Sequence, residues 1–271
     1  MRYKFYSSMT LMAVTIMCMS FVSNESKPKL MEKYVTYISD GISLKGFVVY
    51  DESIKGKRPA ILVVHEWWGL NDYTKNRARQ LASLGYIAMA VDMYGGGMIA
   101  TNTKEAQEMA TPFYKNPQLS KIRLDAALTK LKEFKQTDKS NIAAIGYCFG
   151  GSVVLNSAKL GIDLKGVVSF HGGLAGVGAD KDLLHAKILV CNGAADKFVS
   201  DKDIEAFKHG LDSINAVYTF KSYANATHAF TNPEATKTGK LFNMPIEYNE
   251  AADKASWIDM KDFLAGIFSN K

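Results

Sequence analysis

Continuous apolar runs alternate with helical patterns along most of the chain, after an amphipathic beginning. Residues 34–50 alternate apolar and polar positions around Asp40-Gly41, a pattern typical of an antiparallel hairpin. The next runs are apolar throughout, as is typical of strands buried on both faces of a parallel sheet. These expected strands cover residues 60–66, 86–94, 141–147, 166–172 and 187–193.

Apolar residues at helical spacing separate or follow these runs. The expected helices cover residues 72–85, 121–136, 152–161, 201–214 and 251–268. This alternation predicts an α/β fold with a mostly parallel central sheet, right-handed crossovers and helices on both faces. Because the sequence shows no linker, repeat or low-complexity tract, we expect residues 24–271 to form a single domain.

One connection is longer than such a fold requires. Residues 95–120 begin with three glycines and contain methionine and aromatic residues. Long connections in compact domains frequently cover functional sites. Two interpretations stay open, namely a hinged segment that walls a pocket and an irregular loop followed by an ordinary helix.

The N-terminal residues have the pattern of an export signal. Arg2 and Lys4 precede an apolar stretch over residues 9–22, and a polar, charged segment follows. This order is typical of a signal peptide, and the stretch is shorter than the roughly 20 residues that span a bilayer. We expect residues 1–23 to be removed and the protein to be exported, either to a periplasm or to the medium. A lipid anchor at Cys18 and an uncleaved membrane anchor are the alternatives.

The charge distribution argues against a polyanionic partner. The formal net charge of +6 includes two basic residues of the expected signal peptide, and the other lysines are scattered without a basic, aromatic-rich stripe. We therefore expect no nucleic-acid partner and no membrane contact beyond the signal peptide. A small-molecule substrate and a monomer or weak homodimer fit this composition.

Two cysteines remain after residue 23, and their settings differ. Cys191 lies inside the apolar run 187–193, where a small thiol packs well. Cys148 lies where the apolar run 141–147 gives way to a helical pattern. Two cysteines in an exported chain could form a disulfide, but these settings favour two free thiols.

The pattern around Cys148 predicts a nucleophile. Residues 146–150 read G-x-C-x-G, which is the nucleophile-elbow pattern G-x-S-x-G with sulfur in place of oxygen. An expected strand precedes the pattern and an expected helix follows it, as the elbow requires. The glycines leave space for close backbone approach, and a helix N-terminus favours a thiolate. A structural cysteine in a tight turn is the alternative.

A cysteine nucleophile needs a base, and the base needs an orienting acid. Asp196 and His228 each follow an expected strand, and the order Cys148, Asp196, His228 is that of the α/β-hydrolases. We expect these three residues to form a catalytic triad. Asp196 as a turn cap, with Asp201 or Asp203 as rival acids, and His228 as a half-buried loop residue are the alternatives.

The remaining candidate site residues follow from this assignment. The backbone N–H groups of Phe149 and Trp67 are the expected oxyanion hole. His171 can also have a packing role. The expected substrate pocket contains Trp68, Tyr94, Tyr147, His171 and Phe230.

We expect neither a metal nor a cofactor. His65 and Glu66 begin the zinc-binding pattern H-E-x-x-H, but Gly69 occupies the position of the second histidine. A zinc site would therefore lack a ligand.

The chain resembles the dienelactone hydrolase family, a branch of the α/β-hydrolases. The resemblance rests on five stretches that occur in the same order as in the family: "HEWWGL", "VDMYGGG", "GYCFGG", "GAADKFV" and "THAFTNP". The resemblance implies an α/β-hydrolase fold, no cofactor, and Cys148 as the nucleophile with Asp196 and His228 as its partners. It also implies that Glu66 holds the resting cysteine as a less reactive thiol until substrate arrives.

The sequence departs from the family at two positions. The resemblance implies two arginines that hold a substrate carboxylate, one after the D-x-Y strand end and one shortly past the histidine. Residues 95–97 are glycines here, and residues 229–232 read Ala-Phe-Thr-Asn. Because a buried carboxylate without such partners is costly, we do not expect an anionic dienelactone as substrate.

These observations predict an exported hydrolase that cleaves an ester, lactone or thioester through a covalent thioester intermediate. A peptide or amide hydrolase that uses the same triad is one alternative. A non-catalytic binding protein that keeps the hydrolase fold is another. Cys148 as a redox-sensing thiol is the last, because accessible thiolates oxidise readily.

Overall fold

The computed structural model describes residues 1, 3–4 and 27–269. The expected signal peptide over residues 1–23 lies outside the described residues, apart from positions 1, 3 and 4, and so does Cys18. Among the helices that the structure describes, none combines the length and the apolar character that a bilayer crossing requires.

Within the described residues, eight strands form one sheet in the order β1-β2-β4-β3-β5-β6-β7-β8. The expected hairpin is present, because β1 (Leu30–Ser39) and β2 (Ile42–Asp51) pair antiparallel, and β2 also pairs antiparallel with β4. All neighbouring strands from β3 to β8 pair parallel. Their bounds are β3 (Arg58–Val64), β4 (Ile87–Val91), β5 (Thr137–Tyr147), β6 (Gly166–Phe170), β7 (Lys187–Gly193) and β8 (Tyr218–Tyr223). The mostly parallel sheet is thus confirmed.

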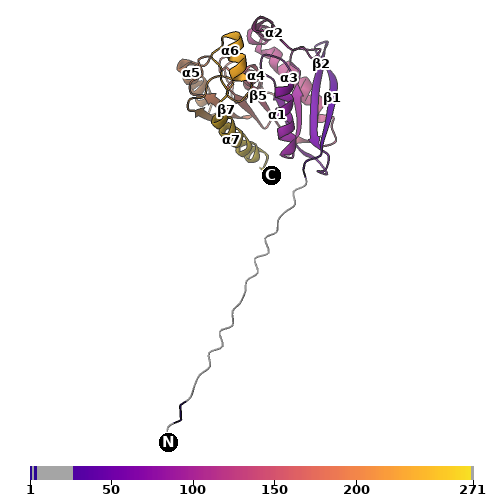
Figure 1. The fold of residues 1–271 in the computed structure, drawn as a ribbon. Coiled ribbons are helices and arrows are strands. Elements are labelled where there is room, and N and C mark those ends of the chain that lie inside the picture. Colours follow the sequence, from indigo (N-terminus) through magenta and orange to yellow (C-terminus); the bar gives the residue numbers. More distant parts are fainter. Residues whose placement is uncertain (2, 5–26, 270–271) are drawn as a thin grey trace.

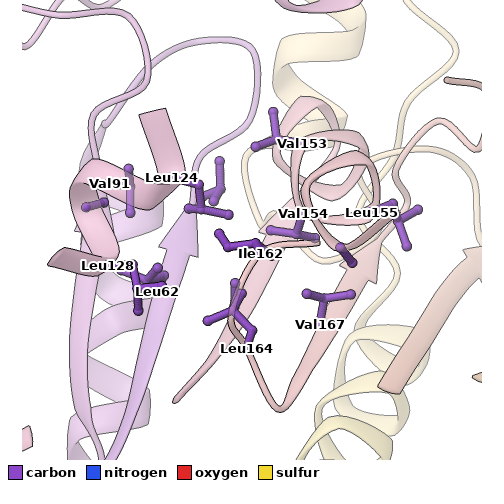
Figure 2. Packing of buried hydrophobic residues seen from close by; sticks show 14 of the residues in the cluster. Leu62, Val91, Leu124, Leu128, Val153, Val154, Leu155, Ile162, Leu164 and Val167 are labelled. Atoms are coloured by element: carbon purple, nitrogen blue, oxygen red, sulfur yellow. The ribbon is translucent and has the colours of Figure 1, made fainter. Parts of the chain in front are cut away.

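Helices cover both faces of this sheet, as expected (Figure 1). One layer holds α3 (Pro117–Lys132), α4 (Phe149–Lys159) and α5 (Asp201–Asp212), and the other holds α1 (Asp72–Ser83) and α7 (Glu250–Phe268). Side chains alternate along β3, so Leu62 packs with the α3 and α4 layer while Ile61 packs with the α1 and α7 layer. Figure 2 shows Leu62 and Val167 among side chains of α3 and α4.

The long connection over residues 95–120 contains an ordinary helix. It holds α2 (Thr103–Lys115) and the beginning of α3, which Pro117 starts. The three glycines have φ angles of 103°, 62° and 74°, which side-chain-bearing residues rarely adopt. The Asp92 carboxylate accepts backbone N–H groups from Tyr94, Gly95 and Gly97. The glycines therefore form a hydrogen-bonded turn.

A second helix, α6 (Ala235–Phe242), was not expected from the sequence. It has only eight residues, and its buried residues are the small Ala235 and Gly239, which give a weak apolar signal in the sequence. Figure 1 shows α6 and α2 at the same end of the molecule. Both helices contribute residues to the cavity described below, Tyr114 from α2 and Thr238 from α6.

Candidate active site

Cys148 lies at the sharp turn from β5 into α4. Its φ of 52° and ψ of −114° are strained for a residue with a side chain, and such strain persists only where the surroundings hold it. The flanking glycines make the turn sterically feasible. A Cβ atom on Gly146 would lie 2.0 Å from the carbonyl oxygen of Gly150, and one on Gly150 would lie 2.4 Å from that of Val64. This is the strand-turn-helix geometry of a nucleophile elbow.

The structure brings Asp196 and His228 to Cys148 from the loops after β7 and β8. His228 Nδ1 lies 2.8 Å from Asp196 Oδ2, and both side chains are largely buried. Burial opposes the charged form of His228, but the negative charge of Cys148 and hydrogen bonds to Asp196 and Cys148 outweigh it and raise the pKa of His228 to about 10. The ring therefore holds its proton at neutral pH beside the sulfur of Cys148.

Two backbone amides next to Cys148 are available to a ligand. Phe149 is the first residue of α4, and Trp67 follows β3. Within the described part of the chain, neither N–H group has a backbone acceptor. Both residues line the same cavity as Cys148. These two amides are therefore candidate donors to a substrate oxygen.

A cavity of about 270 Å³ lies in front of Cys148. Most of its lining is apolar, and no lysine or arginine belongs to it among the described residues, so Lys115 and Lys237 lie outside it. Beyond Cys148 and the two amide-bearing residues, the lining consists of Glu66, Trp68, Tyr114, Ser152, Gly173, Phe198, His228, Ala229, Asn232, Ala235, Thr238, Met244 and Ile246.

Four residues expected in the pocket are absent from this lining, so that expectation is wrong for Tyr94, Tyr147, His171 and Phe230. Strand alternation turns Tyr147 toward the α1 and α7 layer, where it stacks on Phe170 with ring centroids 4.8 Å apart. Phe230 and His171 are fully buried behind the cavity, and the Tyr94 hydroxyl donates to the Trp67 carbonyl oxygen. Tyr94 and His171 contact lining residues from outside the cavity, Tyr94 through Phe149 and His171 through His228.

Several lining residues were missed by the sequence analysis. Tyr114 lies on α2, and the aromatic content of residues 95–120 was the signal that pointed to it. Met244 and Ile246 follow α6 and reach the cavity because Ile246 forms an isolated bridge with His228. No local sequence pattern predicts that the chain comes back to His228 at Ile246.

Glu66 also lines the cavity, although its side chain is almost fully buried. Its Oε2 accepts a hydrogen bond of 2.7 Å from Asn232 Nδ2. Burial raises the pKa of Glu66 to about 7, against the opposite influence of Asn232, His228 and Arg77. This carboxyl group therefore changes its charge near neutral pH at the wall of the cavity.

Comparison with known proteins places this arrangement in a family. The model of the dienelactone hydrolase family matches residues 44–268. The chain belongs to the dienelactone hydrolase family. Its fold is the α/β-hydrolase fold, as the sequence predicted.

Solved structures and curated relatives agree with this assignment. A dienelactone hydrolase-like promiscuous phosphotriesterase, P91, from metagenomic libraries superposes with a TM-score of 0.83 at 32% identity, covering 88% of this chain and 98% of that one. A relative from Methylorubrum extorquens, provisionally named carboxymethylenebutenolidase, is 30% identical over 189 residues, 65% of this chain and 64% of its own. Protein usf of Aquifex pyrophilus is 27% identical over 213 residues, 74% of this chain and 88% of its own.

This dienelactone hydrolase family member has no arginine where the resemblance implied a carboxylate clamp. Asn232 lines the cavity and binds Glu66, while residues 95–97 form the turn held by Asp92. Arg77 is buried outside the lining and pairs with Asp253 at 2.5 Å. The described residues also contain no cluster of three or more His, Cys, Asp or Glu side chains suited to a metal ion.

Proposed function

We propose that the protein hydrolyses neutral esters, lactones or thioesters of small carboxylic acids through a covalent thioester on Cys148. One observation carries the proposal: a buried Asp196–His228 pair at 2.8 Å faces Cys148, which a strained elbow presents to a mainly apolar cavity. Membership of a hydrolase family supports the reaction class.

In the first half of the reaction, the Cys148 thiolate attacks the substrate carbonyl carbon. The carbonyl π electrons move to oxygen, and the Phe149 and Trp67 N–H groups stabilise the oxyanion. Collapse of this intermediate breaks the bond to the leaving alkoxide or thiolate. His228 gives its proton to that leaving group, and Asp196 holds the imidazole in the required orientation.

In the second half, His228 acts as a base. It takes a proton from water, and the hydroxide attacks the thioester carbonyl on Cys148. A second oxyanion forms and collapses, releasing the carboxylic acid and restoring the Cys148–His228 pair. The pairing of Cys148 with His228 supports this scheme, whereas the thiol-holding role of Glu66 rests on the family resemblance alone.

Trapping the acyl group tests this proposal. We expect a p-nitrophenyl ester, quenched with acid during turnover, to add its acyl mass to the peptide that contains Cys148, as read by mass spectrometry. The Cys148→Ala variant should give neither adduct nor turnover. Turnover of a matched amide tests the peptidase alternative. The activity of a peroxide-oxidised sample tests the redox alternative. Turnover by Cys148→Ala, or an adduct elsewhere, would overturn the proposal.

A neutral phosphotriester is a second candidate substrate. The neighbour with 32% identity is named a promiscuous phosphotriesterase. A cavity to which residues 27–269 contribute neither lysine nor arginine suits an uncharged triester. Diethyl p-nitrophenyl phosphate should then release p-nitrophenolate and leave a diethylphosphoryl group on Cys148. If nitrophenolate is released without modification of Cys148, this candidate fails.

Export forms a separate part of the proposal. The basic residues before the apolar stretch at positions 9–22 support a signal peptide. N-terminal sequencing of protein recovered from the periplasm or medium should begin after residue 23 or close to it. Protein found only in the cytosol with its first residue retained would refute export.

A further inference from the structure

His171 lies behind both proposed reacting side chains. Its Nδ1 accepts the backbone N–H of Cys148 at 3.1 Å, and the same N–H donates to the Phe170 carbonyl oxygen at 3.0 Å. Its ring also lies edge-on to the His228 ring, with centroids 5.3 Å apart. His171 is fully buried and does not line the cavity, so it contacts the reacting pair without reaching the space for substrate.

The contacts of His171 fix its tautomer. Because the Cys148 N–H can only donate, Nδ1 of His171 carries no proton. The proton of the neutral ring lies on Nε2, which donates to Thr231 Oγ1 at 2.7 Å. Burial, with the positive charges of His228 and Arg77, holds the pKa of His171 well below its usual value. The ring thus stays neutral over the working pH range.

Thr231 connects His171 to α1 through hydrogen bonds. Its Oγ1 lies 2.7 Å from the Tyr73 hydroxyl, and its carbonyl oxygen accepts Arg77 Nη2 at 2.6 Å. Arg77 in turn pairs with Asp253 of α7 at 2.5 Å. Thr231 lies on the same loop as His228, so one residue links the histidine loop, His171 and the α1 and α7 layer.

We propose that His171 and Thr231 are positioning residues that hold the Cys148 elbow and the His228 ring in reacting geometry. This inference rests on the proposed hydrolysis at Cys148. The elbow has strained dihedral angles, and its amide has two acceptors, one of them a side chain. A strained turn needs such surroundings to persist, and misplacement by about 1 Å can cost about a hundredfold in rate.

A matched pair of substitutions separates the two nitrogens of His171. In His171→Asn the amide oxygen takes the place of Nδ1 and can accept the Cys148 N–H, and asparagine tolerates the φ of 41° at this position. In His171→Gln the amide reaches the place of Nε2 and leaves the Cys148 N–H with one acceptor. We expect His171→Gln to lower kcat about ten- to a hundredfold with KM nearly unchanged, and His171→Asn to keep kcat within about threefold.

A second readout does not need a substrate. The rate at which iodoacetamide alkylates Cys148, measured against pH with Cys148→Ala as the blank, reports the thiolate and its partner His228. We expect His171→Gln to change this pH profile and His171→Asn to preserve it. Thr231→Val keeps the side-chain shape but removes the hydroxyl, and it should lower kcat by about tenfold. Thermal melts check that each variant is folded.

The outcomes are distinguishable from those of the proposed function. The positioning role would be overturned if both folded His171 variants had the wild-type kcat and the wild-type pH profile of alkylation. It would also be overturned if kcat fell equally in the two variants and the fall followed their loss of thermal stability. If wild-type turnover does not depend on Cys148, the proposed function fails, and the alkylation profiles still decide whether His171 positions the thiol.

Discussion

The two described cysteines show how the same side chain acquires opposite properties in one sheet. Cys148 lies just past the end of β5, lines a cavity and has His228 as a partner. Cys191 lies within β7, paired in register with Phe170 and fully buried. Burial raises the pKa of Cys191 to about 12, although a hydrogen bond from Tyr223 opposes this rise. The two thiols are free, as the sequence indicated.

The difference comes from position along a strand. Inside β7 the backbone groups are paired with neighbouring strands and the side chain is packed under α7, so no reactant can approach. At the carboxyl end of β5 the ladder stops, and loops from several strands bring polar groups to one point. The thiol at the strand end faces a cavity and a histidine, whereas the thiol inside the strand is sealed from any reactant and has only the Tyr223 hydroxyl as a hydrogen-bond partner.

The largest effect should come from substitutions that remove Cys148 or its partners. We expect Cys148→Ala and His228→Ala to lower kcat/KM for a neutral ester by about 10⁴-fold or more, and Asp196→Asn to leave more activity because the orienting acid usually contributes less. Steady-state kinetics on folded variants measure this. Normal turnover by Cys148→Ala would remove the distinction between the two thiols.

The next effect concerns Glu66, which lines the same cavity as Cys148. Its folded pKa of about 7 lies above its ordinary value of 4.5, so the folded state holds an extra proton between these values and wild-type stability falls as pH rises through this range. Glu66→Gln does not titrate. We expect its stability relative to wild type to improve by on the order of 2 to 3 kcal/mol between pH 4.5 and pH 8.

Urea unfolding at several pH values measures this difference. Glu66→Asp serves as a control that still titrates. A constant difference between Glu66→Gln and wild type across the range would show that the carboxyl group is not held neutral by burial.

A smaller effect is expected from the charge of the substrate. A carboxylate beside the reacting carbonyl would enter a cavity to whose lining the described residues contribute Glu66 but neither lysine nor arginine. We expect kcat/KM to fall about tenfold or more relative to a matched neutral lactone, because the carboxylate loses charge-assisted hydrogen bonds. Assays of the pair at low and high salt test this. Equal or faster turnover of the anionic lactone would restore a dienelactone-like substrate.

The smallest effect on activity is expected at the other thiol. Cys191→Ser should keep kcat within about twofold and lower the free energy of unfolding by about 1 to 2 kcal/mol, because it buries a hydroxyl group in an apolar layer. Ester kinetics and urea unfolding check the two statements. Loss of ester hydrolysis in a folded Cys191→Ser protein would mean that the two thiols share a function.

The sequence by itself determined the order of elements and the place of the elbow. The alternation of apolar runs and helical spacing is local, and the glycines around Cys148 were recognisable because the turn permits no side chain there. The chain order of Cys148, Asp196 and His228 placed each after a strand. In a parallel sheet the strand ends meet at one edge, so their proximity followed from topology.

The tertiary structure alone decided what surrounds these residues. Met244 and Ile246 reach the cavity through the pairing of Ile246 with His228, and Tyr147 and Phe230 turned away from it. The contacts of Thr231 with His171 and Tyr73 join residues 60 and 158 positions apart. Local periodicity records which face of its own element a side chain occupies. It does not record which distant element packs against that face, because close packing of many side chains decides that at once.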